Sequence, residues 1–168
     1  MWLVSIFAVF VLFFSFIGGL KEGAVKQFFN LVILLIAIPL AGISYRLIAR
    51  VLSFLPGENW ENFIGFFIAL ALISVILHFV FFLPRRIVQK IWRRGFLFRL
   101  LGGVLNTINA SIGMVVFTLV LLAYPIFDWL ARWVAGSSVL ASLVNMFGFV
   151  SSMLPEVLQN GSTMVNVI

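Results

Sequence analysis

The side chains that could carry out chemistry in this 168-residue chain are few and scattered. There are five acidic residues, a single histidine, and no cysteine. Nucleophilic catalysis needs a base beside the nucleophile, acid–base hydrolysis needs paired carboxylates, and a metal site needs clustered ligands. The acids lie in different segments, so we expect no catalytic residue, no metal site and no cofactor. The lack of cysteine also excludes disulfides and thiolate chemistry. The sequence predicts a protein that is not an enzyme.

His78 is the one residue that could respond to protons. It lies near the end of a long apolar run, where a titratable ring is expensive to bury and is often functional. No Asp, Glu or second His lies within any such run to pass a proton onward. His78 is therefore a candidate proton-sensitive residue without an evident relay partner.

Small and amide residues form a stripe near the chain's last long apolar run. Gly102, Asn106, Asn109 and Gly113 follow one another at spacings of 4, 3 and 4, which places them on one helix face. Such a stripe packs helices closely in lipid, and its amides can hydrogen-bond across the contact. It could instead line a polar pathway, but two uncharged amides offer little for conduction. Gly19 and Gly23 repeat the four-residue spacing, so we expect both sets to mediate helix packing or oligomer contact.

Four apolar runs must position these residues, at about residues 2–20, 28–44, 63–83 and 101–124. Each is near or above the ~18 residues that indicate a spanning helix, and the runs are continuous rather than alternating, which disfavours a β-barrel. Mean hydropathy is +1.24, with 64% hydrophobic residues. The sequence predicts an all-α, polytopic membrane protein forming one membrane domain over residues 1–168. We expect the first run to be retained as a span, because no basic stretch precedes it.

The net charge of +6 is concentrated in the loop before the last run. Six basic residues lie there without an acid: Arg85, Arg86, Lys90, Arg93, Arg94 and Arg99. The positive-inside rule predicts that this loop is cytoplasmic, which puts the N-terminus, residues 51–62 and the C-terminal tail outside. Interleaved Ile87, Ile91, Trp92 and Phe96 predict a short helix in the inner headgroup layer, with its basic face on anionic lipid. A nucleic-acid role is the disfavoured alternative.

Residues 125–168 form a tail with a different character. Asp128 and Arg132 are four residues apart, and Trp129 and Trp133 suit a membrane interface. Residues 139–154 place apolar side chains on one side and Ser and Asn on the other. We expect an amphipathic helix on the outer surface, packed on or near the bundle, with a fifth span as the alternative.

Two short stretches resemble landmarks of the colicin V production protein family, CvpA. The first is Gly19–Gln27 (GLKEGAVKQ), between the first apolar run and Phe28-Phe29-Asn30-Leu31-Val32, and it looks like the family's first inner turn. The second is Arg99–Val104 (RLLGGV), entering the last run. The chain departs from the family pattern at Ser5, where an aspartate is usual, and at Asn106, where a glycine would be expected.

The resemblance implies a multi-pass protein of the bacterial inner membrane that supports production or export of the peptide toxin colicin V, and envelope homeostasis. We interpret the chain as a non-catalytic accessory or scaffold that works as a homo-oligomer or within an export or envelope complex. The rival hypothesis is a small oligomeric channel or transporter, with a pore assembled between protomers and His78 or the asparagine stripe facing water.

Overall fold

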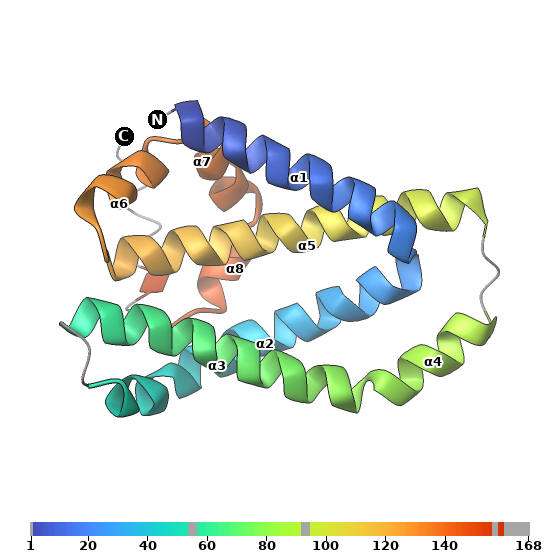
Figure 1. The fold of residues 1–168 in the computed structure, drawn as a ribbon, viewed down its shortest axis with the longest axis horizontal. Helices are drawn as coiled ribbons and strands as arrows, with labels where there is room; N and C mark the ends of the chain where they lie inside the picture. The colour runs from blue at the N-terminus through green and yellow to red at the C-terminus, as the bar shows by residue number, and fades with distance from the viewer. Residues whose placement is uncertain (1, 54–56, 92–94, 156–157, 160–168) are drawn as a thin grey trace.

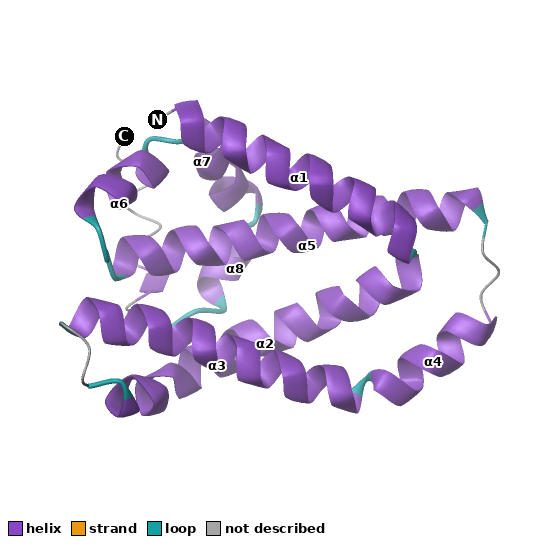
Figure 2. Ribbon diagram, in the orientation of Figure 1, coloured by secondary structure: helices purple, strands orange, loops and turns teal. Residues whose placement is uncertain are grey.

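The computed structural model describes residues 2–53, 57–91, 95–155 and 158–159, and these residues form helices joined by turns, without strands (Figure 2). Within these ranges, four helices are long and apolar enough to cross a membrane. They are α1 (Trp2–Glu22), α2 (Ala24–Val51), α3 (Glu58–Val80) and α5 (Phe96–Ala123). The prediction of an all-helical protein with four candidate spans is therefore confirmed.

The two longest helices form the centre of the bundle. α2 packs against both α3 and α5, and α1 packs mainly against α5 (Figure 1). α5 is accordingly the most buried of the four and α1 the least. The outward faces of α1 and α3 carry exposed Phe, Leu and Val, such as Phe7, Leu72 and Phe79. Exposure of this kind is unfavourable in water but suits contact with lipid.

Backbone contact holds α1 against α5 at one end of the bundle. A Cβ atom on Gly102 would lie 2.5 Å from the carbonyl oxygen of Gly19 and 2.7 Å from the carbonyl carbon of Gly23. A Cβ on Gly19 would in turn overlap the carbonyl oxygen of Gly102. Gly23 has φ +82°, which favours glycine, and it joins α1 to α2 as a single-residue turn. These three glycines therefore fix where α1 meets α5 and where α2 begins.

The opposite end is closed by a pair of tyrosines. Tyr45 of α2 and Tyr124, which follows α5, share a buried hydrogen bond with 2.9 Å between their oxygens. Burial and, to a smaller extent, the hydrogen bond with Tyr45 raise the pKa of the Tyr124 hydroxyl above its ordinary value. The Tyr124 hydroxyl therefore keeps its proton at neutral pH, and the link between α2 and α5 persists.

The tail is broken into three short helices, so the prediction of one helix over residues 139–154 is wrong. These are α6 (Asp128–Ala135), α7 (Ser138–Met146) and α8 (Gly148–Ser152), with the break at Phe147. At ~1.5 Å per residue none of them can cross a bilayer, and the fifth-span alternative fails for the same reason. The break lets the apolar side chains of both α7 and α8 turn toward the core.

The tail is inserted into the bundle rather than spread on its surface. Leu140, Val144, Val150 and Leu154 are buried in the same apolar cluster as Tyr45. Ser137 is fully buried, and its hydroxyl lies 2.9 Å from that of Ser5 at the start of α1. α6 and α7 accordingly lie beside the N-terminal end of α1 (Figure 1).

Gly42 of α2 provides the space for the end of the tail. A Cβ atom there would lie 2.6 Å from the ring Cδ of Pro155. The glycine inside α2 therefore serves tail docking, and the helix runs past Pro39 to Val51 without interruption.

The basic loop differs from its predicted form in one respect. A short helix, α4 (Phe82–Ile91), follows α3 directly, with Pro84 in its first turn, where proline is tolerated. Phe96, predicted to belong to the loop helix, instead begins α5. Trp92, Arg93 and Arg94 lie outside the described residues, and the side chains of Lys90 and Ile91 are not described either.

We expect Gly102→Leu to destabilise the protein by ~1–3 kcal/mol or more, because the new side chain must displace the α1 backbone. Gly113→Leu is the matched control in the same helix, since a Cβ there meets nothing within 4 Å. Denaturation of the detergent-solubilised protein measures both. Equal stability of the two variants would contradict the tight contact.

Candidate functional site

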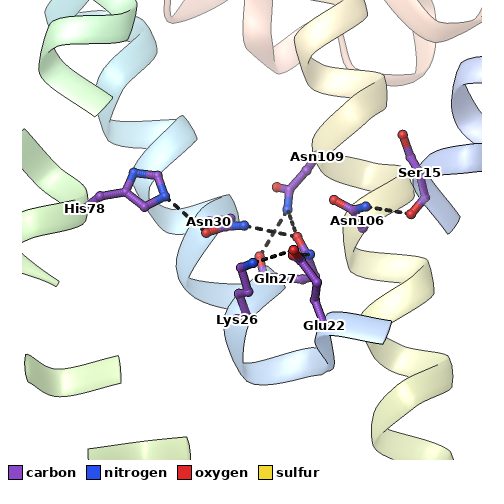
Figure 3. Close-up of polar contacts among 8 residues, drawn as sticks. All are labelled: Ser15, Glu22, Lys26, Gln27, Asn30, His78, Asn106 and Asn109. Atoms are coloured by element: carbon purple, nitrogen blue, oxygen red, sulfur yellow. Dashed lines mark hydrogen bonds and ion pairs between the residues drawn. The ribbon is translucent and has the colours of Figure 1, made fainter. Parts of the chain in front are cut away.

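A hydrogen-bonded cluster of polar side chains lies where α1, α2, α3 and α5 approach one another (Figure 3). Its centre is Gln27 of α2, which is only 1% exposed. Burial makes its hydrogen bonds to protein groups obligatory, because water cannot replace them. The other members are Glu22, Lys26, Asn30, His78 and Asn109.

Gln27 joins three segments of the chain. Its Nε2 donates to Glu22 Oε2 at 2.6 Å, at the end of α1. Its Oε1 accepts from Asn30 Nδ2 and from Asn109 Nδ2, both at 3.3 Å. Asn109 Nδ2 also donates to the backbone oxygen of Gln27 at 3.1 Å. One buried amide thus ties α5 to α2 and to the turn between α1 and α2.

The carboxylate of Glu22 fixes the direction of these bonds. An ionised carboxylate only accepts, so Gln27 must present its NH₂ to Glu22 and its oxygen to Asn30. Glu22 also forms an ion pair with Lys26 one turn along the chain. Asn30 therefore donates to Gln27, and Gln27 donates to the negatively charged carboxylate of Glu22.

His78 of α3 stands at the far end of this chain. Its Nδ1 lies 2.8 Å from the backbone oxygen of Ser74, and its Nε2 lies 3.3 Å from Asn30 Oδ1. Both neighbours are acceptors, since the Asn30 NH₂ faces Gln27. Only an imidazole ring with hydrogens on both nitrogens donates to both. The cluster thus places an oxygen within hydrogen-bond distance of each ring nitrogen of His78, and the proton-sensitive role stays a prediction.

The predicted stripe on α5 does not face a single partner. Gly102 and Asn106 face α1, where Asn106 Nδ2 donates to the backbone oxygen of Ser15 at 2.6 Å. Asn109 faces α2, and its Oδ1 is buried without a hydrogen-bond partner. Gly113 is exposed. Together with Gly19 and Gly23, three of the four stripe residues lie at contacts within one chain.

The described basic residues of the loop carry charge away from the bundle core. Arg85 and Arg86 lie on α4, with the Arg86 guanidinium 4.3 Å from the centre of the Phe82 ring. Arg99 is exposed in the first turn of α5. No acidic residue lies in this segment. The arrangement suits a negatively charged surface such as anionic lipid, which stays a prediction.

Sequence reasoning missed Glu22, Gln27 and Asn30 as members of one cluster. The second apolar run starts at residue 28 and leaves Gln27 in a predicted loop, whereas α2 begins at Ala24. The spacing of three residues between Gln27 and Asn30 was the available signal, because it brings both onto one helix face.

The cluster offers acceptors and donors but little catalytic apparatus. The described residues contain no group of three or more His, Cys, Asp or Glu that could hold a metal ion. Its one carboxylate already accepts from Lys26 and Gln27. What this arrangement can do is brace four helices against one another, with the His78 ring hydrogen-bonded at its edge.

Comparison with known proteins yields one match. A family model described as colicin V production protein matches residues 4–148 of the 168. No curated protein and no solved structure matches the chain. The match runs from the start of α1 through the buried tail helix α7, so it covers all four candidate spans, the glycine contact and the polar cluster. This chain belongs to the colicin V production protein family.

Proposed function

We propose that this protein is a non-catalytic accessory or scaffold of the bacterial inner membrane, supporting colicin V production or export and envelope homeostasis. Family membership supports the biological setting. The geometry of the polar cluster supports the scaffold role. An accessory protein needs a stable bundle with surfaces for partners, and does not need a reactive centre or a continuous polar path.

One observation carries this proposal: the amides of α5 are used in bonds within the chain. Asn106 donates to α1 and Asn109 donates to α2. Hydrogen bonds of this kind between helices contribute ~0.6–2 kcal/mol each in membranes. The NH₂ groups engaged in this way stabilise helix contacts, and the unpartnered oxygen of Asn109 is buried rather than open to a pathway.

The same proposal includes an orientation. The turn at Gly23 and the basic helix α4 lie at the same end of the bundle (Figure 1). Lys21, Lys26 and the basic loop residues are therefore gathered on one side, which the positive-inside rule favours as cytoplasmic. The other end holds Glu58, Glu61 and the tail, together with Arg46 and Arg50, and we propose that it faces outward.

A homo-oligomer or a larger complex is part of this proposal as well. Gly19, Gly23, Gly102 and Asn106 are engaged between α1 and the rest of the same chain, so they are poor candidates for an intermolecular surface. The exposed apolar faces of α1 and α3 are the better ones.

We expect Gln27→Met to lower the free energy of unfolding by ~1–3 kcal/mol, because Asn109 and Asn30 lose a buried acceptor and Glu22 loses a donor. Gln89→Met is the control, since it makes the same change at an exposed position of α4. Denaturation in detergent compares them. If Gln27→Met were as stable as Gln89→Met, the cluster would not brace the bundle.

A single cysteine can be added cleanly, since the natural chain has none. In intact cells, we expect a membrane-impermeant maleimide to label Asn59→Cys and to leave Gln89→Cys unlabelled until the membrane is opened. Both side chains are exposed, so accessibility differs only by side. Labelling of Gln89→Cys in intact cells would reverse the proposed orientation.

The accessory role predicts restored colicin V secretion in a strain that lacks its own family member, together with no ion or proton flux from the purified protein in liposomes. Folded Gln89→Met protein serves as the expression control. Flux above that of empty liposomes would favour the channel or transporter instead. A correctly inserted protein that restores no secretion would contradict the proposed role.

A further inference from the structure

Two hollows meet at Trp129 on the end of the bundle that carries the tail. One is polar, with a volume of about 760 Å³, and lies between the start of α3 and α6. The other is apolar, with a volume of about 630 Å³, and lies between α1, α5 and α6. Trp129 lines both, so the two hollows lie next to each other, one polar and one apolar.

The apolar hollow is a groove that runs along two helices. Its walls come from Leu3 to Val11 of α1 and from Ala110 to Phe117 of α5, and Trp133 of α6 contributes to its lining. At ~1.5 Å per residue these segments extend ~10–12 Å, close to the ~15 Å depth of one hydrocarbon leaflet. No charged residue lines it. Its length and lining suit an acyl chain.

Gly113 keeps this groove open. It lines the groove, is exposed, and a Cβ atom there would meet nothing within 4 Å. Unlike Gly19 and Gly102, it is not required for contact between helices of the chain. The glycine therefore provides open space on α5 rather than a close helix approach.

The polar hollow carries charges of both signs. Glu58 and Asp128 contribute carboxylates, and Arg132 contributes a guanidinium. Arg132 Nε donates to the backbone oxygen of Asp128 at 3.3 Å, which holds the guanidinium one turn from Trp129. A headgroup with a phosphate and an ammonium matches this pattern, because guanidinium groups bind phosphates and carboxylates attract ammonium.

We propose that this site binds one zwitterionic phospholipid from the leaflet at the N-terminal end of α1. An acyl chain occupies the apolar groove, the phosphate contacts Arg132, and the ammonium lies near Glu58 and Asp128. The two charge signs beside an apolar groove favour a lipid over a second helix, which would need only the apolar part. The proposal is independent of the accessory role and differs from the predicted anionic-lipid contact of the basic loop, at the other end.

Native mass spectrometry with added dioleoyl phosphatidylethanolamine or dioleoyl phosphatidylglycerol tests this site. We expect one phosphatidylethanolamine per natural chain, retained at least tenfold more strongly than phosphatidylglycerol, which lacks the ammonium. Gly113→Leu should weaken binding of both lipids at least tenfold, because its side chain fills the groove. Gly148→Leu is the matched control, since a Cβ there also meets nothing within 4 Å.

Substitutions of the charged residues in the polar hollow test recognition of the headgroup separately from filling of the groove. Arg132→Gln should weaken phosphatidylethanolamine binding severalfold, whereas Arg50→Gln, an exposed arginine at the end of α2, should not. The double variant Glu58→Gln, Asp128→Asn should abolish the preference over phosphatidylglycerol. Equal retention of the two lipids by the natural chain, or unchanged retention by Gly113→Leu, would overturn the proposal. A dimer that Gly113→Leu dissociates would assign the groove to a second copy instead.

Fluorescence provides a second measurement, which uses the conservative change Trp133→Phe and does not fill the groove. Phosphatidylethanolamine with brominated acyl chains should quench the fluorescence of Trp133, seen as quenching that is lost in Trp133→Phe. Quenching that is the same in both proteins would place the acyl chain elsewhere and overturn the proposal.

Discussion

The arrangement of this bundle depends on the contact between the backbones of α1 and α5 at Gly19 and Gly102. Neither position has room for a Cβ atom, so the backbones of the two helices are in direct contact there. From that point they diverge toward the other end (Figure 1). The contact fixes the place where the chain turns through Gly23, and therefore the position at which α2 starts.

The polar cluster follows directly from this turn. Because α2 begins one residue after α1 ends, Glu22 and Gln27 are brought together, and Asn109 reaches them from α5. In lipid an unsatisfied amide costs several kcal/mol, so these groups stabilise the fold chiefly by satisfying one another. The buried Asn109 Oδ1 is the exception within the cluster, since it has no partner. The side-chain oxygens of Gln27 and Glu22 therefore accept hydrogen bonds, whereas the acceptor Asn109 Oδ1 has no partner.

Much of this could be predicted from the sequence, and the rest could not for physical reasons. Continuous apolar runs predict spans well, because a helix must satisfy its own backbone in lipid. The amphipathic pattern of residues 139–154 does not distinguish the membrane surface from the bundle core, which is why it predicts a surface helix although Val150 and Leu154 are buried. Residue spacing indicates that Gly102, Asn106 and Asn109 face a neighbour, but not which neighbour, and Gly113 in the same stripe faces an open groove. Nothing near Gly42 in the sequence indicates that it makes room for the tail, because that role depends on Pro155, more than 100 residues away.

The divergence of α1 and α5 also explains why one stripe of small residues has two roles. Near the crossing point, Gly102 is enclosed by backbone and a larger side chain has no space. Three turns later the helices have separated, and Gly113 faces an apolar groove instead. The tail fills part of the opening, since α7 contacts both α1 and α5, and α6 borders what remains open. Ala8 of α1 and Val134 of α6 are both buried beside this opening. The break at Phe147 and the groove beside α6 are thus two consequences of the same geometry, in which helices held by glycine at one end must be separated by side chains at the other.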